Sequence, residues 1–493
     1  MPVGWSLIPH GCRLNPEPLH AGTPAHAQAP PHPRRPRLPH PAHRPRWVLR
    51  AHRLVLPRTP AHAPRPPSRT QRPLGARTRE ERAAPVYLNL WEAWQALPPP
   101  ARSANQYPPL DVAPADPEFP AFAAAVDALA PHLDAARQAA TRPTLGADFE
   151  PPDPAYLASM GQPLHDEVIA GAAIHLRIPG LGAASTAADL LLIDAEHAAA
   201  RGDAARAAAD LHAALAIARQ LNQVPLFIAD VLAVRLVTDA SRRTIRILHA
   251  HPGLLDSPAL VALHADLART ANDLRTRFDT ERLAITDLLD RTFTPGPHGR
   301  ITAVGLERLE SIFQHPSAEL GGLIASRHAT LAPLRSRAIG TRAEHLDLLD
   351  RHLADAEAAR TAGPAALAAF WASESDMLWG DPARQRRLPL MIALTPMYAS
   401  AIQSEHAMRL EAAAACVALA MHHHHAHHAA FPETLDQLVP RYLSALPPDP
   451  YDRAGGTIKH RGHAHAFTLY YNGVNALDDN ATPPTTGPGA PQR

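Results

Sequence analysis

The chain of 493 residues contains little lysine, little cysteine and few aromatic residues. Lys459 is the only lysine, and no G-x-x-x-x-G-K-[ST] loop surrounds it, which excludes a Walker-type nucleotide site and leaves one residue for Schiff-base chemistry. The two cysteines, Cys12 and Cys416, lie far apart, so one chain forms neither a disulfide framework nor a cysteine zinc site. Aromatic residues make up only 5%, so alanine and leucine are expected to fill the core.

Common catalytic motifs are also missing. The sequence has no H-E-x-x-H, G-x-S-x-G or C-x-x-C, and Gly180-Leu181-Gly182 lacks the third glycine of a dinucleotide-binding loop. There is no signal peptide, and no apolar run approaches the roughly 18–20 residues of a membrane span, so membrane association would need an anchor outside this sequence. These absences favour a non-enzymatic protein without a resident cofactor, although an enzyme is left open.

The formal net charge of +1 hides two oppositely charged regions. Residues 1–80 hold 14 arginines and two acidic residues, whereas residues 81–493 carry a net charge of −11. A body of that sign has no basic face for phosphates. Nucleic-acid binding is therefore expected only through the N-terminal arm.

The arm, residues 1–83, is expected to be disordered, because its first 80 residues hold 18 prolines and repelling arginines. Two interpretations stay open. Arg34, Arg35, Arg37 and their neighbours would contact nucleic acid or an anionic membrane. Alternatively, the arm is not an authentic product. The chain has 47 arginines and one lysine, which indicates that GC-rich DNA encodes it. Such DNA, when it is read in a wrong frame, yields mixtures of arginine, proline, alanine and histidine.

Residues 84–398 are predicted to form an α-helical body, and residues 481–493 a disordered tail. Ser185 or Thr186 is expected to cap a helix that ends at Gly202, and Asp203 to cap the next. This pair resembles a tetratricopeptide-type hairpin within a stack of helical hairpins, although no repeat near 34 residues follows it. Further helices are expected at the following ranges, the second with Ser257 as its cap: 226–249, 258–291, 301–314, 318–336, 341–362 and 364–377.

The run from Met421 to His428 contains six histidines and ends a helix that is expected to begin near Ala399. On a helix, His423 with His427 and His424 with His428 are four residues apart, where two imidazoles can share a metal ion. Further ligands would come from the nearby histidines His460, His463 and His465. One interpretation is a zinc, nickel or copper site; the other is a compositional run with adventitious metal affinity, because no carboxylate lies nearby to orient the rings.

Acidic residues also neighbour histidines within the predicted helices, as in Glu344-His345, Asp350-Arg351-His352 and Glu405-His406. General acid and base catalysis uses such groups. We expect instead that they lie on solvated helix faces and form local ion pairs. No catalytic residue is therefore predicted.

After the histidine run, Phe431 to Leu443 reads F-P-x-x-L-x-x-L-V-P-x-Y-L, and Leu446 to Asp452 is a proline-rich turn. The segment Gly456 to His460 predicts a first strand, Phe467 to Tyr470 a second, and Asp478-Asp479 an acidic loop. With the preceding long helix, this order over residues 399–480 resembles the C-terminal region of the type II secretion major pseudopilin family, which implies a small α+β module.

The resemblance implies that a calcium ion binds at Asp478 and Asp479, with Asn480 as a further ligand; the alternative is a solvated acidic turn. The prepilin cleavage motif and apolar N-terminal helix of a filament subunit are missing. The expected protein is thus a mostly α, non-enzymatic scaffold or adaptor of the bacterial cell envelope that carries a pseudopilin-like module and binds a protein partner. The alternatives are a metal-binding protein or metal-dependent enzyme that uses His422 to His428, and a nucleic-acid-binding protein.

Overall fold

The structure is a computed structural model that describes residues 81–98, 114–150, 178–306, 337–388, 391, 398–452, 455–463 and 466–472. All of these belong to the unit of the chain that spans Arg69–Thr482. Residues 1–80 of the predicted arm, the tail, the helix predicted at 318–336 and the end of that at 301–314 lie outside the described residues.

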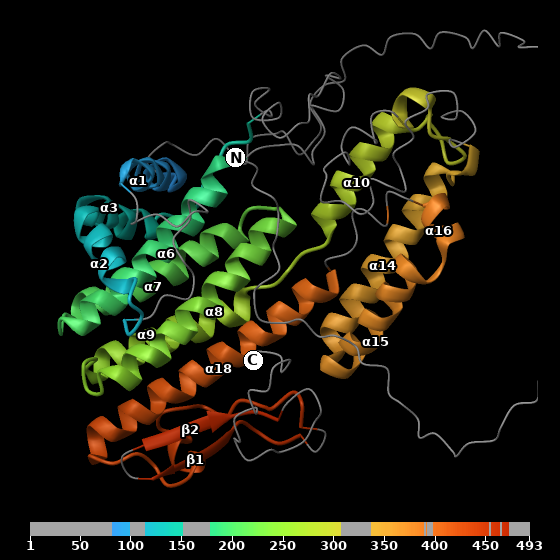
Figure 1. The fold of residues 1–493 in the computed structure, drawn as a ribbon. Helices are drawn as coiled ribbons and strands as arrows, with labels where there is room; N and C mark the ends of the chain where they lie inside the picture. The colour runs from blue at the N-terminus through green and yellow to red at the C-terminus, as the bar shows by residue number, and fades with distance from the viewer. Residues whose placement is uncertain are drawn as a thin grey trace, which may run out of the picture. The chain divides into compact units, whose positions relative to one another are not determined.

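The described residues are mostly helical, which confirms the prediction of a mostly α fold (Figure 1). The α-helices are α1 Ala84–Ala96, α2 Phe119–Ala128, α3 Ala130–Ala140, α6 Pro179–Ala200, α7 Ala204–Asn222, α8 Phe227–Ala250, α9 Ser257–Asp273, α10 Asp279–Thr292, α14 Arg342–Ala362, α15 Pro364–Ser375, α16 Pro382–Arg387 and α18 Tyr398–His428. A π-helical turn, Asp376–Gly380, follows α15, and a 3-10 helix, Leu435–Leu438, follows α18. The strands β1 Lys459–His463 and β2 Ala466–Tyr470 form an antiparallel hairpin in which Lys459 pairs with Tyr470.

Helices α6 and α7 pack against each other as an antiparallel pair joined by a short turn (Figure 1). Gly202 adopts a φ of 76°, and the Asp203 side chain accepts a hydrogen bond from the Arg206 N–H at 3.0 Å, as the sequence predicts. The predicted cap at Ser185 or Thr186 is wrong, because α6 already begins at Pro179. Ser185 lies inside the helix, where its Oγ accepts a hydrogen bond from Arg235 at 2.7 Å.

The single helix predicted over 258–291 is also wrong, because the chain leaves the helical path between α9 and α10. The N-cap is Asp256 rather than Ser257. In the connection, the N–H groups of Thr276 and Arg277 each donate at 2.9 Å, to Glu405 of α18 and to Asp230 of α8 respectively. Carboxylates distant in the sequence thus take the backbone donors that would otherwise continue the helix.

The largest core cluster joins α1, α2, α3, α6, α7, α8 and α9 to the middle of α18. Alanine and leucine supply most of it, in line with the expectation from composition. Small side chains let helix axes approach closely, and α6 is buried along nearly its whole length as a result. A second cluster forms between α10 and α14, and a third around Phe278 and Tyr398.

Charged residues within this core are paired with one another. Arg137 of α3 bridges two fully buried carboxylates, those of Asp194 at 2.5 Å and Asp210 at 2.6 Å. Arg243 and Arg246 of α8 both bind the buried carboxylate of Glu196 on α6. A buried charge is tolerated only when it is paired and hydrogen-bonded, so these pairs set the register between the helices.

Replacing Glu196 with alanine is expected to lower the free energy of unfolding by about 3–5 kcal/mol, because Arg243, only 2% exposed, would lose the buried carboxylate that its guanidinium binds. The matched control removes a carboxylate from an exposed pair: Asp350, 46% exposed, binds Arg282, and Asp350→Ala is expected to cost less than about 1 kcal/mol. Urea unfolding followed by circular dichroism measures both. Equal losses would contradict the structural role of the buried pair.

Candidate functional site

The histidine run forms the last two turns of α18, where the helix meets the C-terminal hairpin (Figure 1). His422 points inward and packs edge-on against Phe431 and Phe467, with ring centroids 5.2 and 5.9 Å away. His427 and His428, one to two turns later, are exposed. The run therefore divides into a buried part and a surface part.

The structure brings together the histidine pairs that the sequence predicts. The ring centroids of His423 and His427 are 4.7 Å apart, and those of His424 and His428 are 4.3 Å apart. Sequence reasoning missed Tyr442, whose hydroxyl lies 3.0 Å from Nδ1 of His427 and 3.2 Å from Nε2 of His428. The only sequence signal for Tyr442 was its place in the pseudopilin-like pattern.

Further metal ligands do not join these pairs within the part of the chain that the structure describes. There, no group of three or more histidine, cysteine, aspartate or glutamate residues is arranged to hold a metal ion. His460 and the backbone of His463 lie in β1, whereas His465 falls outside the described residues, as do Asp478, Asp479 and Asn480 of the predicted calcium loop.

Burial makes the inner histidines hard to protonate. It lowers the pKa of His422 to about 4, with a further contribution from the neighbouring His425 and His249. Burial also lowers the pKa of His423 and of His424. These rings are thus neutral at pH 7, the form in which imidazole binds metals or exchanges hydrogen bonds.

The segment after α18 packs on the end of that helix. Leu435, Leu438, Leu443 and Ile458 form a separate apolar cluster with Val417, Ala420 and Met421 of α18. The buried carboxylate of Asp449 closes the proline-rich turn, because it accepts hydrogen bonds from the N–H groups of Tyr451 at 2.9 Å and Asn472 at 2.8 Å. The lone lysine, Lys459, donates to Asn472 Oδ1 at 2.5 Å.

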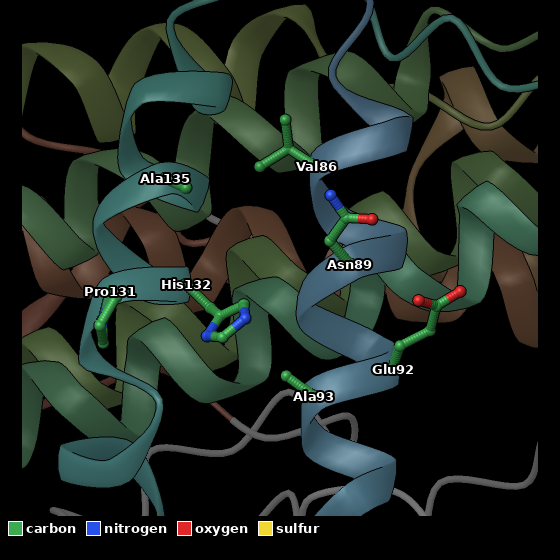
Figure 2. A pocket seen from close by; sticks show the side chains of 7 residues that line it. All are labelled: Val86, Asn89, Glu92, Ala93, Pro131, His132 and Ala135. Atoms are coloured by element: carbon green, nitrogen blue, oxygen red, sulfur yellow. The ribbon is translucent and has the colours of Figure 1, made fainter.

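A cavity of about 600 Å³ lies between the hairpin and the helices α8 and α18. Its walls are mainly apolar, and its polar lining residues are His249, Glu411, His422 and Tyr471, whose hydroxyl donates to the Leu410 carbonyl at 3.3 Å. A second hollow, of about 550 Å³, lies between α1 and α3, where His132 extends from α3 toward α1 (Figure 2). His132 and Glu92, its ionisable lining residues, are both exposed, so this hollow has no desolvated reactive group.

The expectation that acid and histidine pairs lie on solvated faces is wrong for His345, His352 and Glu405, which are buried. His352 Nε2 lies 2.9 Å from the Glu374 carboxylate, and its ring packs on Phe370 and Tyr398. Helix α14 contributes Leu349 to the second cluster and Ala356, two turns later on the same face, to the third, so this face is covered at both levels. The high charge of α14 indicates an exposed helix, so the sequence did not predict the burial of its histidines.

No protein-family model matches this chain, and neither a curated protein nor a solved structure matches it significantly. Among the helices that the structure describes, none is both long and apolar enough to pass through a membrane. The resemblance to pseudopilins therefore stays a prediction.

The His422 side chain is expected to make the protein less stable as the pH falls from about 6.5 to 4. Its pKa is about 4 in the folded chain and about 6.5 in the unfolded chain, so the unfolded state binds the extra proton in that window. Between pH 7 and 5 the wild type should lose about 2 kcal/mol more than the His422→Phe variant. Unfolding in urea at each pH measures this difference, and parallel pH dependences would rule it out.

Proposed function

We propose that this chain is a non-enzymatic helical scaffold or adaptor of the bacterial cell envelope, with a C-terminal module like that of the type II secretion pseudopilins. The observation that carries the proposal is the packing of Leu435, Leu438, Leu443 and Ile458 on the last turns of α18. The same helix packs against α8 and α9, so the module is joined to the helical body through one continuous helix. A scaffold needs such a connection if it is to hold the module in a constant orientation relative to the helical body.

The Asp449 interactions support the pseudopilin-like interpretation. In the pseudopilin-like pattern, the turn before the hairpin contains an aspartate between two prolines. Here that aspartate ties the turn to Asn472 at the end of the hairpin, and the N–H of Asp449 donates to the Gly456 carbonyl at 2.9 Å. An aspartate in this position therefore has a structural purpose that the short motif alone did not reveal.

The helical body supports a role in protein binding. The α6–α7 pair has the antiparallel packing, glycine turn and small interface residues of a tetratricopeptide-type hairpin. Stacked hairpins present surfaces to protein partners. The buried carboxylates Asp194, Glu196 and Asp230 are each engaged by arginine, so they serve the packing of the helices.

The test is made in the native bacterial host with epitope-tagged, full-length protein. We expect the wild type in the envelope fraction, cross-linked to a secretion or envelope component. Asp449→Asn should reduce that cross-link at least fivefold, because the amide keeps only one acceptor oxygen and places its NH2 donor against the other backbone N–H group. Faster hydrogen exchange in β1 and β2, with unchanged exchange in α6 and α7, would verify that only the module is loosened.

The matched control is Asp436→Asn, which alters an exposed carboxylate of the same module. It should retain the wild-type cross-link. Recovery of the wild type in the soluble fraction, without a cross-link to any envelope protein, would overturn the proposal.

A metal-binding role is the second candidate, favoured by the stacked pairs His423–His427 and His424–His428 beside Tyr442. Protein purified without an affinity step should contain stoichiometric zinc, nickel or copper if this role is correct, as measured by mass spectrometry of the metals. His424→Asn with His428→Asn should then remove the metal. Less than stoichiometric metal would leave only the adventitious affinity of neutral imidazoles.

Two further proposals concern residues outside the described part of the chain. Calcium binding would use Asp478 and Asp479. Nucleic-acid binding would use the arginines of residues 1–80, and its signature would be a steep salt dependence that disappears when these residues are deleted.

A further inference from the structure

The cavity beside the histidine run is bounded by three elements that meet at the module. The end of α8 contributes Ile245 and Leu248, and β2 contributes Phe467 and Leu469. The volume of about 600 Å³ is within the roughly 300–1,000 Å³ range of small-molecule sites. The space is thus large enough for a ligand of several carbon atoms.

Alanine residues on α18 create this space. Ala407, Ala414 and Ala418 face the cavity at helical spacing, opposite the large side chains of β2. Leucine at any of them would fill part of the volume and add apolar contacts. The hairpin is held in place on the other side by the Asp449 turn and the Leu438 cluster, so the walls are positioned by packing elsewhere in the module.

The polar groups of the cavity define the chemistry of its ligand. His422 is 8% exposed, and neither of its ring nitrogens has a hydrogen-bond partner among the described residues, although the ring contacts Phe431 and Phe467. A neutral imidazole offers one donor and one acceptor. A hydroxyl or amide group can hydrogen-bond to the ring nitrogen that it meets, as a donor or as an acceptor.

The charges nearby are already matched. The carboxylate of Glu411 accepts hydrogen bonds from Arg242 at 3.1 and 3.2 Å, and His249 stands at the exposed edge of the cavity. A charged ligand group would therefore lose its hydration without gaining a free counter-charge inside. The lining favours an uncharged head group.

We propose that this cavity binds a small uncharged amphipathic molecule, whose apolar body lies between α18 and β2 and whose hydroxyl or amide group hydrogen-bonds to His422. The site is separate from the surface pairs formed by His423 to His428. It does not depend on the envelope role, so the two proposals stand or fall independently.

The test uses the full-length protein and four eight-carbon compounds: 1-octanol, octanamide, octanoate and octylammonium. Each competes with the uncharged fluorescent probe N-phenyl-1-naphthylamine at pH 7.5. The two uncharged compounds should displace the probe at least tenfold more effectively than the two ions. Equal displacement by all four, or none by any, would overturn the proposal.

Three variants locate the site. Ala414→Trp should weaken binding at least twentyfold because the indole fills the cavity, and Ser400→Trp, which adds the same bulk at an exposed position of α18, should leave binding unchanged. His422→Phe keeps a planar ring at this position but removes its hydrogen-bonding nitrogens. The variant should bind 1-octanol about fivefold more weakly, which is the effect of losing one hydrogen bond. Wild-type affinity in both Ala414→Trp and His422→Phe would show that the compounds bind elsewhere.

Discussion

The apolar packing of α18 is the interaction on which the arrangement of the described chain depends. Its middle belongs to the core of the helical body, and its end to the core of the C-terminal module. The two cores overlap along the helix, since Cys416 lies in the first core and Val417 in the second, on different faces of the helix. Consecutive residues point about 100° apart on a helix, so a single element can serve two cores. Loss of packing at this helix would therefore affect both parts of the protein.

The alanine-rich composition of the helical body explains why its buried charges form pairs of arginine and carboxylate. Alanine-rich helices approach closely, and close approach leaves little room for water around the polar residues between them. Arginine can satisfy two carboxylates at once with its planar, forked donors, as Arg137 does for Asp194 and Asp210. Lysine, with one compact charge, is poorly suited to that geometry. A chain with 47 arginines and one lysine is thus well supplied for buried ion pairs.

The sequence predicts those parts of the fold that depend on local chemistry. The turn at Gly202 and Asp203 follows from backbone conformation and capping, and β2 follows from the alternation of apolar residues, whereas β1 begins at Lys459, three residues after the start of the predicted first strand. The break between α9 and α10 was not predictable in this way, because the groups that cause it, Asp230 and Glu405, are distant in the sequence. The burial of His352 was missed for the same reason, since its partner Glu374 belongs to another helix.

The candidate site also combines features that follow from local sequence with features that depend on distant contacts. Spacing alone correctly pairs His423 with His427 and His424 with His428, because four residues make about one turn. Spacing could not distinguish His422, because its different environment comes from Phe431 and Phe467 of the packed module. A run of similar residues thus acquires dissimilar chemistry from the surfaces that cover it. The exposed histidines are open to solvent, whereas His422 is kept neutral and lines an apolar cavity. For this reason the buried member of the run is a better candidate for selective recognition than the more conspicuous exposed ones.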